Sequence, residues 1–266
     1  MLLIRFEQIG TLEQIAMRSF EDRAYAHLNR YFPRHCDLLG ETQVRRVVPI
    51  GLRKSIDYGL TAESCVQSYI DFMCLLGSGF DSDPLLPWAA NALNDRSNAD
   101  PIERGDDLYD RGWAYIGHIV ADYRDAQGNP TTARFVEEIR AVRGMSDKSI
   151  YDTEILVFAN HLYDRIVRVL PAKTEYVGEE RIRLQIARGV EAANGYGITS
   201  ERGLVLFCVL KIILGDGFDR DPLLPWASKV LNDETIADQT VRVDRLLGEG
   251  VGFLNRWWDS GPERKA

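Results

Sequence analysis

Two nearly identical acidic phrases hold the residues best suited to chemistry in this chain. The first reads GFDSDPLLPWA over Gly79–Ala89, and the second reads GFDRDPLLPWA over Gly217–Ala227. In the second copy Asp216, Asp219 and Asp221 follow a D-x-x-D-x-D spacing. Clustered carboxylates of this kind bind hard cations such as Ca²⁺ and Mg²⁺. A metal-dependent enzyme that uses these loops is therefore one hypothesis for the protein.

The same phrases are also explained as tight corners of a fold. The spacing lacks the glycine and the distal glutamate of an EF-hand loop, and Ser78 replaces the first aspartate in the first copy. Asp83-Pro84 and Asp221-Pro222 are strong turn signals, because an aspartate bonds its own backbone and a proline fixes φ. We therefore favour a structural corner over a metal site, and we predict no metal ligand, no cofactor and no catalytic residue.

Five residues are candidates for binding a partner protein. They are the paired aspartates of the two phrases and one tryptophan of the last helix: Asp81, Asp83, Asp219, Asp221 and Trp257. Trp257 lies beside the apolar stripe of that helix and not within it, so we expect it to be exposed. Exposed tryptophans are frequent central contacts of protein interfaces. The four histidines form no metal-binding pair, and no GxSxG, P-loop or dinucleotide motif is present.

The rest of the chain repeats with the same offset of 138 residues. Between Leu75–Asp95 and Ile213–Asp233, 15 of 21 positions are identical. The repeat extends upstream and downstream without a gap, which indicates two units over 5–123 and 143–261. The segment 124–142 between them starts with turn residues and continues as a helical stretch, so we interpret it as a linker. Two long copies of this kind indicate a tandem duplication and not a solenoid.

Each unit has the pattern of a helical protein. Thr11–Phe32 and Ser149–Leu170 are long amphipathic stretches, and each is stopped by a proline. The following segments carry an apolar residue at every fourth position, and Thr61 and Thr199 are expected to cap the next helices. No segment shows sustained two-residue alternation. We predict an all-α protein with two tandem homologous units of about five helices each.

The third long helix differs between the two copies in a way that predicts a contact. A polar strip in the first copy is replaced by apolar residues in the second: Gln67, Ser68 and Asp71 become Val205, Leu206 and Val209. A helix that is apolar on every side is normally buried on every side. We expect this face to dock within the chain, on the first unit or on the linker helix near Phe135. The alternative is a surface for a partner or for a second copy.

Composition excludes some classes of partner. The formal net charge is −8, which argues against nucleic-acid binding because phosphates need clustered Lys and Arg. The start of the chain lacks the features of a signal peptide, and the longest apolar stretch, Leu204–Leu214, is too short to span a bilayer. The four cysteines show no CxxC pattern and are expected to be free, mostly buried thiols. We predict a cytoplasmic protein with no nucleic-acid or membrane partner.

The repeated phrases also carry a family resemblance. YGLTAE…GSGFDSDPLLPWAANALND and YGITSE…GDGFDRDPLLPWASKVLND resemble an uncharacterised family of small bacterial helical proteins, which is associated with gene clusters of type VI secretion and polymorphic toxins. The resemblance covers both halves. It implies an accessory role that binds a protein: an immunity protein that neutralises a cognate toxin, or an adaptor or chaperone for a secreted effector. A homo-oligomer is also open.

Overall fold

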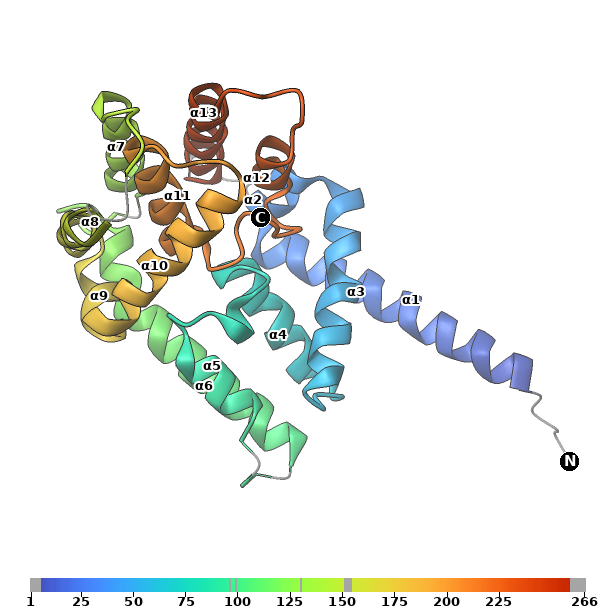
Figure 1. Ribbon diagram of the computed structural model, residues 1–266. Coiled ribbons are helices and arrows are strands. Elements are labelled where there is room, and N and C mark those ends of the chain that lie inside the picture. Colours follow the sequence, from blue (N-terminus) through green and yellow to red (C-terminus); the bar gives the residue numbers. More distant parts are fainter. Residues whose placement is uncertain (1–5, 96, 99, 130, 151–154, 259–266) are drawn as a thin grey trace, which may run out of the picture.

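The structure is a computed structural model that describes residues 6–95, 97–98, 100–129, 131–150 and 155–258, with the backbone alone for 6–16 and 258. This described part contains thirteen α-helices, three short 3₁₀ helices and no β-strand (Figure 1). The prediction of an all-α protein is confirmed. None of the helices in these ranges is both long enough and apolar enough to cross a membrane.

The helices fall into two sets with a shorter helix between them. The N-terminal half is α1 (Phe6–Tyr31), α2 (Pro33–Leu39), α3 (Glu41–Asp57), α4 (Glu63–Leu76), α5 (Pro87–Leu93) and α6 (Pro101–Ile119). The connection contains α7 (Ala133–Ala141). The C-terminal half is α8 (Ile155–Val169), α9 (Pro171–Val177), α10 (Glu179–Gly195), α11 (Glu201–Leu214), α12 (Pro225–Leu231) and α13 (Gln239–Trp258). The bounds of α2–α5 recur in α9–α12 at an offset of 138 residues.

Each half therefore has six helices in the described ranges, one more than the sequence pattern predicts. The additional helices are α2 and α9, and both begin at the proline that was expected only to end the helix before it. Proline fits the first position of a helix, because its missing N–H would have no partner there. The proposed unit limits stay a prediction, and residues 5, 151–154 and 259–261 within them lie outside the described residues.

The predicted caps are wrong by one residue. The N-cap of α4 is Ala62, which makes no side-chain bond. The N-cap of α11 is Ser200, whose hydroxyl accepts a hydrogen bond from the N–H of Gly203. Both residues follow the threonines that the pattern favours, so a one-residue shift of the boundary moves the cap.

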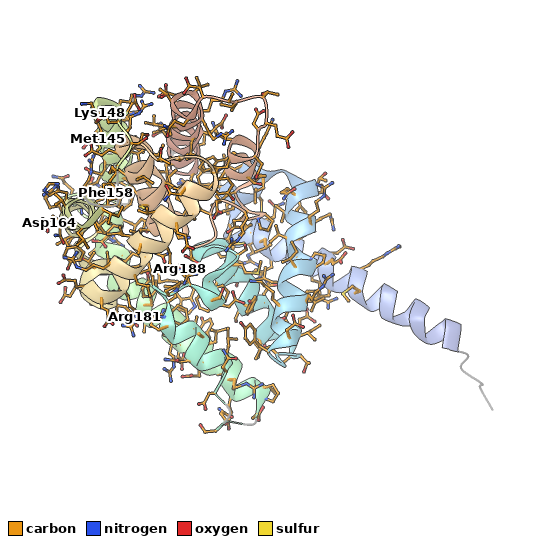
Figure 2. All side chains as sticks on the ribbon, in the orientation of Figure 1. Met145, Lys148, Phe158, Asp164, Arg181 and Arg188 are labelled. Atoms are coloured by element: carbon orange, nitrogen blue, oxygen red, sulfur yellow. The ribbon has the colours of Figure 1, made fainter. Side chains whose placement is uncertain are left out.

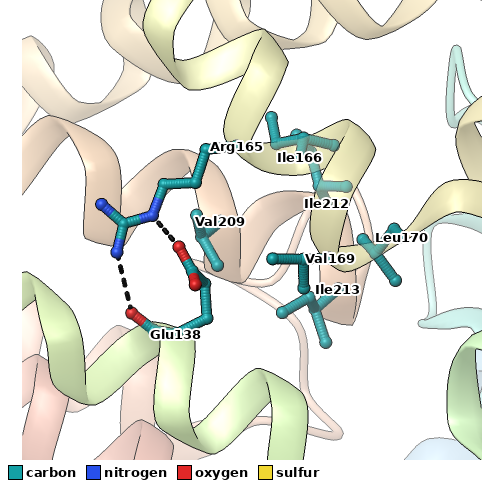
Figure 3. A pocket seen from close by; sticks show the side chains of 8 residues that line it. All are labelled: Glu138, Arg165, Ile166, Val169, Leu170, Val209, Ile212 and Ile213. Carbon is teal, nitrogen blue, oxygen red and sulfur yellow. Dashed lines mark hydrogen bonds and ion pairs between the residues drawn. The ribbon is translucent and has the colours of Figure 1, made fainter.

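The apolar face of α11 is covered from within the chain, as predicted. Val205, Leu206 and Val209 are all buried, and they share one core cluster with Phe135 and Ile139 of α7. Figure 3 shows Val209 of α11 near the contact between α7 and α8, where Glu138 of α7 forms an ion pair with Arg165 of α8. The space left there has a volume of about 10 Å³, which is room for about one water molecule.

The two halves are interlocked and do not lie simply side by side. The last long helix of each half packs on the short proline-led helix of the other half: α6 packs on α9, and α13 on α2 (Figure 1). One leucine is also exchanged between the cores. Leu85 belongs to the N-terminal half but packs in the core of the C-terminal half, and Leu223 does the reverse.

Candidate functional site

The two acidic phrases meet where the halves cross. Asp83 and Asp221 each close a local turn, because Oδ1 accepts the N–H of the residue two positions later at 2.8 Å. The second oxygen reaches the other half: Asp83 Oδ2 accepts the N–H of Asp216 at 3.0 Å, and Asp221 Oδ2 accepts the N–H of Ser78 at 2.7 Å. We call the residues Ser78, Asp83, Asp216 and Asp221 the seam. The local turns were predicted, but the bonds across the seam were not.

Two glycines allow the backbones to approach at the seam. Gly77 and Gly215 have φ values of 96° and 107°, in the left-handed region that side chains disfavour. A Cβ atom on Gly215 would lie 2.8 Å from the carbonyl oxygen of Leu76 in the other half. On Gly77 it would lie 3.0 Å from the carbonyl oxygen of Leu214. The crossing therefore needs glycine in both copies.

Asp81 and Asp219 anchor the phrases to their own halves. Asp81 accepts hydrogen bonds from the hydroxyl of Tyr69 at 2.8 Å and from Lys54 Nζ at 3.1 Å. Asp219 accepts one from the hydroxyl of Tyr196 at 2.9 Å. Burial, together with the nearby Asp219, raises the pKa of Tyr196 to about 12. These tyrosines are therefore donors at neutral pH, and the contacts are those of a folded corner.

The aspartates of the second phrase do not form a metal site. Asp216 is paired with the buried Lys211 at 2.8 Å and with Arg188 of α10 at 3.2 Å (Figure 2 labels Arg188). Burial is the largest single influence and raises the pKa of Asp216, but the bond and charge of Lys211, the bond from Gln185 and the charge of Arg188 together hold this pKa below its ordinary value. Asp221 uses both oxygens as described above, whereas Asp219 uses Oδ2, and its Oδ1 has no hydrogen-bond partner among the described residues. The described part of the chain contains no group of three or more metal-binding side chains.

The structure places the predicted partner-binding residues largely inside the molecule. Asp81, Asp83, Asp219 and Asp221 are all buried and bonded within the chain. Trp257 is partly buried and not exposed as expected, because its ring packs at 4.6 Å from the ring of His35. A role for these residues in partner binding stays a prediction, and their burial does not favour it.

A cavity of about 220 Å³ lies between the halves, next to the seam. Three of its wall pairs are equivalent positions of the two halves, at the 138-residue offset: Leu75 and Ile213, Ile116 and Leu254, Ile119 and Trp257. Asp83 also lines it, so two of the five predicted site residues meet here. No sequence motif indicates this cavity, because each wall is an ordinary apolar helix face until the halves are brought together.

A few polar groups line this mostly apolar cavity. Lys173 is buried and donates a hydrogen bond to the carbonyl oxygen of Ile212. Burial lowers its pKa, an effect that the nearby Asp83 and Asp122 oppose. Tyr115 is also fully buried, and its hydroxyl has no hydrogen-bond partner among the described residues. Largely apolar cavities with a few convergent polar groups are typical small-molecule sites.

A second candidate site is an exposed strip of α6, which we call the α6 face. It consists of Ile102, Asp106, Tyr109, Asp110 and Trp113. Ile102, Tyr109 and Trp113 are about half exposed, at 53%, 48% and 47%. The position in α13 that matches Tyr109 is Leu247, which is buried in the cluster that includes the α7 residues. Helix α7 packs along α13, and no counterpart of it covers the α6 face in the described structure.

Comparisons with models of known protein families, with curated proteins and with solved structures found no match to this chain. The chain's own geometry therefore supplies the candidate sites. They are the cavity between the halves and the exposed α6 face.

Proposed function

We propose that the protein is a non-catalytic, protein-binding accessory of a bacterial secreted-toxin module, and that it acts as an immunity protein that neutralises a cognate toxin. The resemblance of the repeated phrases suggests the class. The exposed α6 face is the observation that carries the binding role. We also propose that the two halves arose by tandem duplication, which the recurring helix bounds support.

The α6 face has the composition of a protein interface. The rings of Tyr109 and Trp113 pack against each other at 6.1 Å, and both stay about half exposed. Aromatic residues are enriched in interfaces and dominate their binding energy. The residue equivalent to Tyr109 in the other half, Leu247, is buried. The helix packing of this fold therefore does not require an exposed aromatic residue at this position. Binding of a partner would bury these exposed rings.

Charge indicates what kind of partner fits. Glu103, Asp106 and Asp110 are exposed on the same helix, and the whole chain is acidic. Complementary charge speeds association and fixes the orientation of a complex. The toxin surface that binds here would present apolar side chains surrounded by Lys and Arg. A second copy of this chain would bring like charge to this face, so it fits less well.

The runner-up role is an effector adaptor, which would use the same face for a different outcome. A cytoplasmic location is part of the proposal, and it is supported by four cysteines that are all free and buried. A metal-dependent enzyme at the acidic phrases is the weakest alternative, because their carboxylates are already bonded within the fold.

The test is co-expression with each candidate toxin encoded by the genes that flank this one. We expect the wild-type protein to protect cells, and the double variant Tyr109→Ala, Trp113→Ala to protect poorly while its melting temperature stays near wild type. Leu184→Ala, at an exposed position of α10, is the matched control and should protect fully. Equal killing with and without the wild-type protein excludes immunity. The adaptor role instead requires that deletion of the gene blocks delivery of the effector while the producing cells stay healthy.

A further inference from the structure

The cavity between the halves has the size of a small-molecule site. An engineered apolar cavity of about 150 Å³ binds benzene in another protein. At about 220 Å³, this cavity has room for a molecule of roughly ten non-hydrogen atoms. Its walls include Leu76, Leu86 and Phe135, in addition to the three matched pairs. A mostly apolar ligand therefore fits the larger part of the walls.

Tyr115 supplies a hydrogen-bond donor without an acceptor. The side chain is fully buried and lines the cavity, yet its hydroxyl has no partner within the described structure. Buried hydroxyls are nearly always paired, because an unpaired one loses its bond to water without replacement. Burial also raises the pKa of Tyr115 well above its ordinary value, so the hydroxyl keeps its proton. It is the one unpaired buried donor among the described residues of the cavity wall.

The charges around the cavity favour a neutral ligand. Lys173 is its one buried cation among the described wall residues, and Asp83 and Asp122 both act on it electrostatically. Asp83 and Asp122 also lie near the Tyr115 hydroxyl. The one cation of the wall therefore already has two carboxylates near it. An anionic ligand would bring a further negative charge into a poorly solvated space, which is unfavourable.

We propose that this cavity binds a small, uncharged, mostly apolar molecule whose single polar group accepts a hydrogen bond from the hydroxyl of Tyr115. The walls come from both halves, so the bound molecule contacts Leu75 on one side and its equivalent Ile213 on the other. Binding to the native state alone raises the melting temperature. The ligand would therefore also hold the two halves together at the seam.

The experiment uses three probes of the same shape and equal non-hydrogen atom count with the full-length chain. Acetophenone carries an acceptor, cumene carries none, and benzoate carries a charge. Affinity is measured by calorimetry, and the melting temperature is followed with each probe. We expect acetophenone to bind about tenfold more tightly than cumene, and benzoate to bind most weakly. Tyr115→Phe should remove the preference for acetophenone over cumene. Tyr31→Phe, at an exposed position outside the cavity, should leave this preference unchanged.

Two further measurements keep the test decisive if Tyr115→Phe fails to fold. In the wild-type protein, NMR cross-relaxation should connect the acetophenone ring with the methyl groups of Leu75 and Ile213. Ile213→Phe should fill part of the cavity and weaken all probes. If no probe binds, the cavity is not a ligand site. If benzoate binds as tightly as acetophenone, or if cumene does, the chemical class is wrong. If the methyl groups of Leu75 and Ile213 show no contact, the probes bind elsewhere.

Discussion

Asp83 accepts a hydrogen bond at 3.0 Å from the backbone N–H of Asp216, in the opposite half of the molecule. The equivalent pair makes the equivalent bond, from the N–H of Ser78 to Asp221 at 2.7 Å. Each acidic phrase therefore closes a turn of its own half and satisfies a buried donor of the other. This relationship explains why both phrases keep the Asp-Pro pair: each half depends on the corner of its neighbour.

The first prediction concerns these carboxylates. Asp83→Ala and Asp221→Ala should each lower the free energy of unfolding by about 2 kcal/mol, because each removes a turn bond and leaves a buried N–H of the other half unpaired. Urea unfolding of the purified variants measures the loss. Ser82→Ala, at an exposed position in the same loop, is the control and should change stability by less than about 0.5 kcal/mol. A similarly small loss for both aspartate variants would show that the seam bonds are dispensable.

The second prediction concerns the glycines at the crossing. Gly215→Ala should destabilise by about 2–4 kcal/mol, because the new Cβ meets the carbonyl oxygen of Leu76 at 2.8 Å and φ is 107°. Gly217→Ala is the matched control two residues away. Its φ is not in the left-handed region, and its Cβ would meet nothing closer than 4.0 Å. Thermal unfolding of both variants tests the difference, and equal melting temperatures would contradict the crossing geometry.

The sequence indicated the helices well because their signals are local. Apolar spacing, the stopping proline and the capping residue placed the C-terminal end of α1 and the N-cap of α4 within one residue of their observed positions. The short α2 and α9 were missed because a proline was interpreted only as a stop, whereas it is also a favourable first residue. The burial of α11 was predicted from its difference from α4, since replacing a polar strip by apolar residues needs a new cover.

The candidate sites were harder to predict, because they depend on how the halves meet. The aspartate turns were predicted from the Asp-Pro pairs, but that accounts for only one oxygen of each carboxylate. The second oxygen bonds a residue more than a hundred positions away, and no local pattern encodes such a bond. The cavity was missed for the same reason. Trp257 was expected outside because its partner His35 lies on α2, in the other half.

The third prediction tests the cover of α11 with a matched pair. Val205→Asp should unfold the protein or lower its stability by more than about 3 kcal/mol, since it buries a charge in the cluster with Phe135. Gln67→Asp introduces the same charged residue at the equivalent position of α4, where the side chain is already polar. Gln67 is only partly buried, so this variant should stay folded. Circular dichroism and urea unfolding of both variants measure the contrast. A stable, folded Val205→Asp variant would show that α7 does not cover this face.

The fourth prediction concerns His35, which lies at the contact between α2 and α13. Its side chain is buried against Phe32 and Trp257, and burial lowers its pKa from about 6.5 to about 4. The unfolded chain therefore binds a proton between these pH values while the folded chain does not. The stability that neutral His35 contributes is complete above pH 6.5 and falls as the pH is lowered toward 4.

The loss of folding stability due to His35 should reach at most about 3 kcal/mol near pH 4. Burial raises the pKa of Asp83 and Asp221, and these groups favour the folded state as the pH falls, so the net curve mixes opposite effects. Comparison with His35→Leu isolates the histidine: wild type should lose stability relative to this variant from pH 6.5 downward. His161→Gln, at an exposed position, is the control and should follow the wild-type curve. Urea unfolding across pH 4–8 measures the curves, and parallel curves for wild type and His35→Leu would show that His35 titrates as an exposed histidine does.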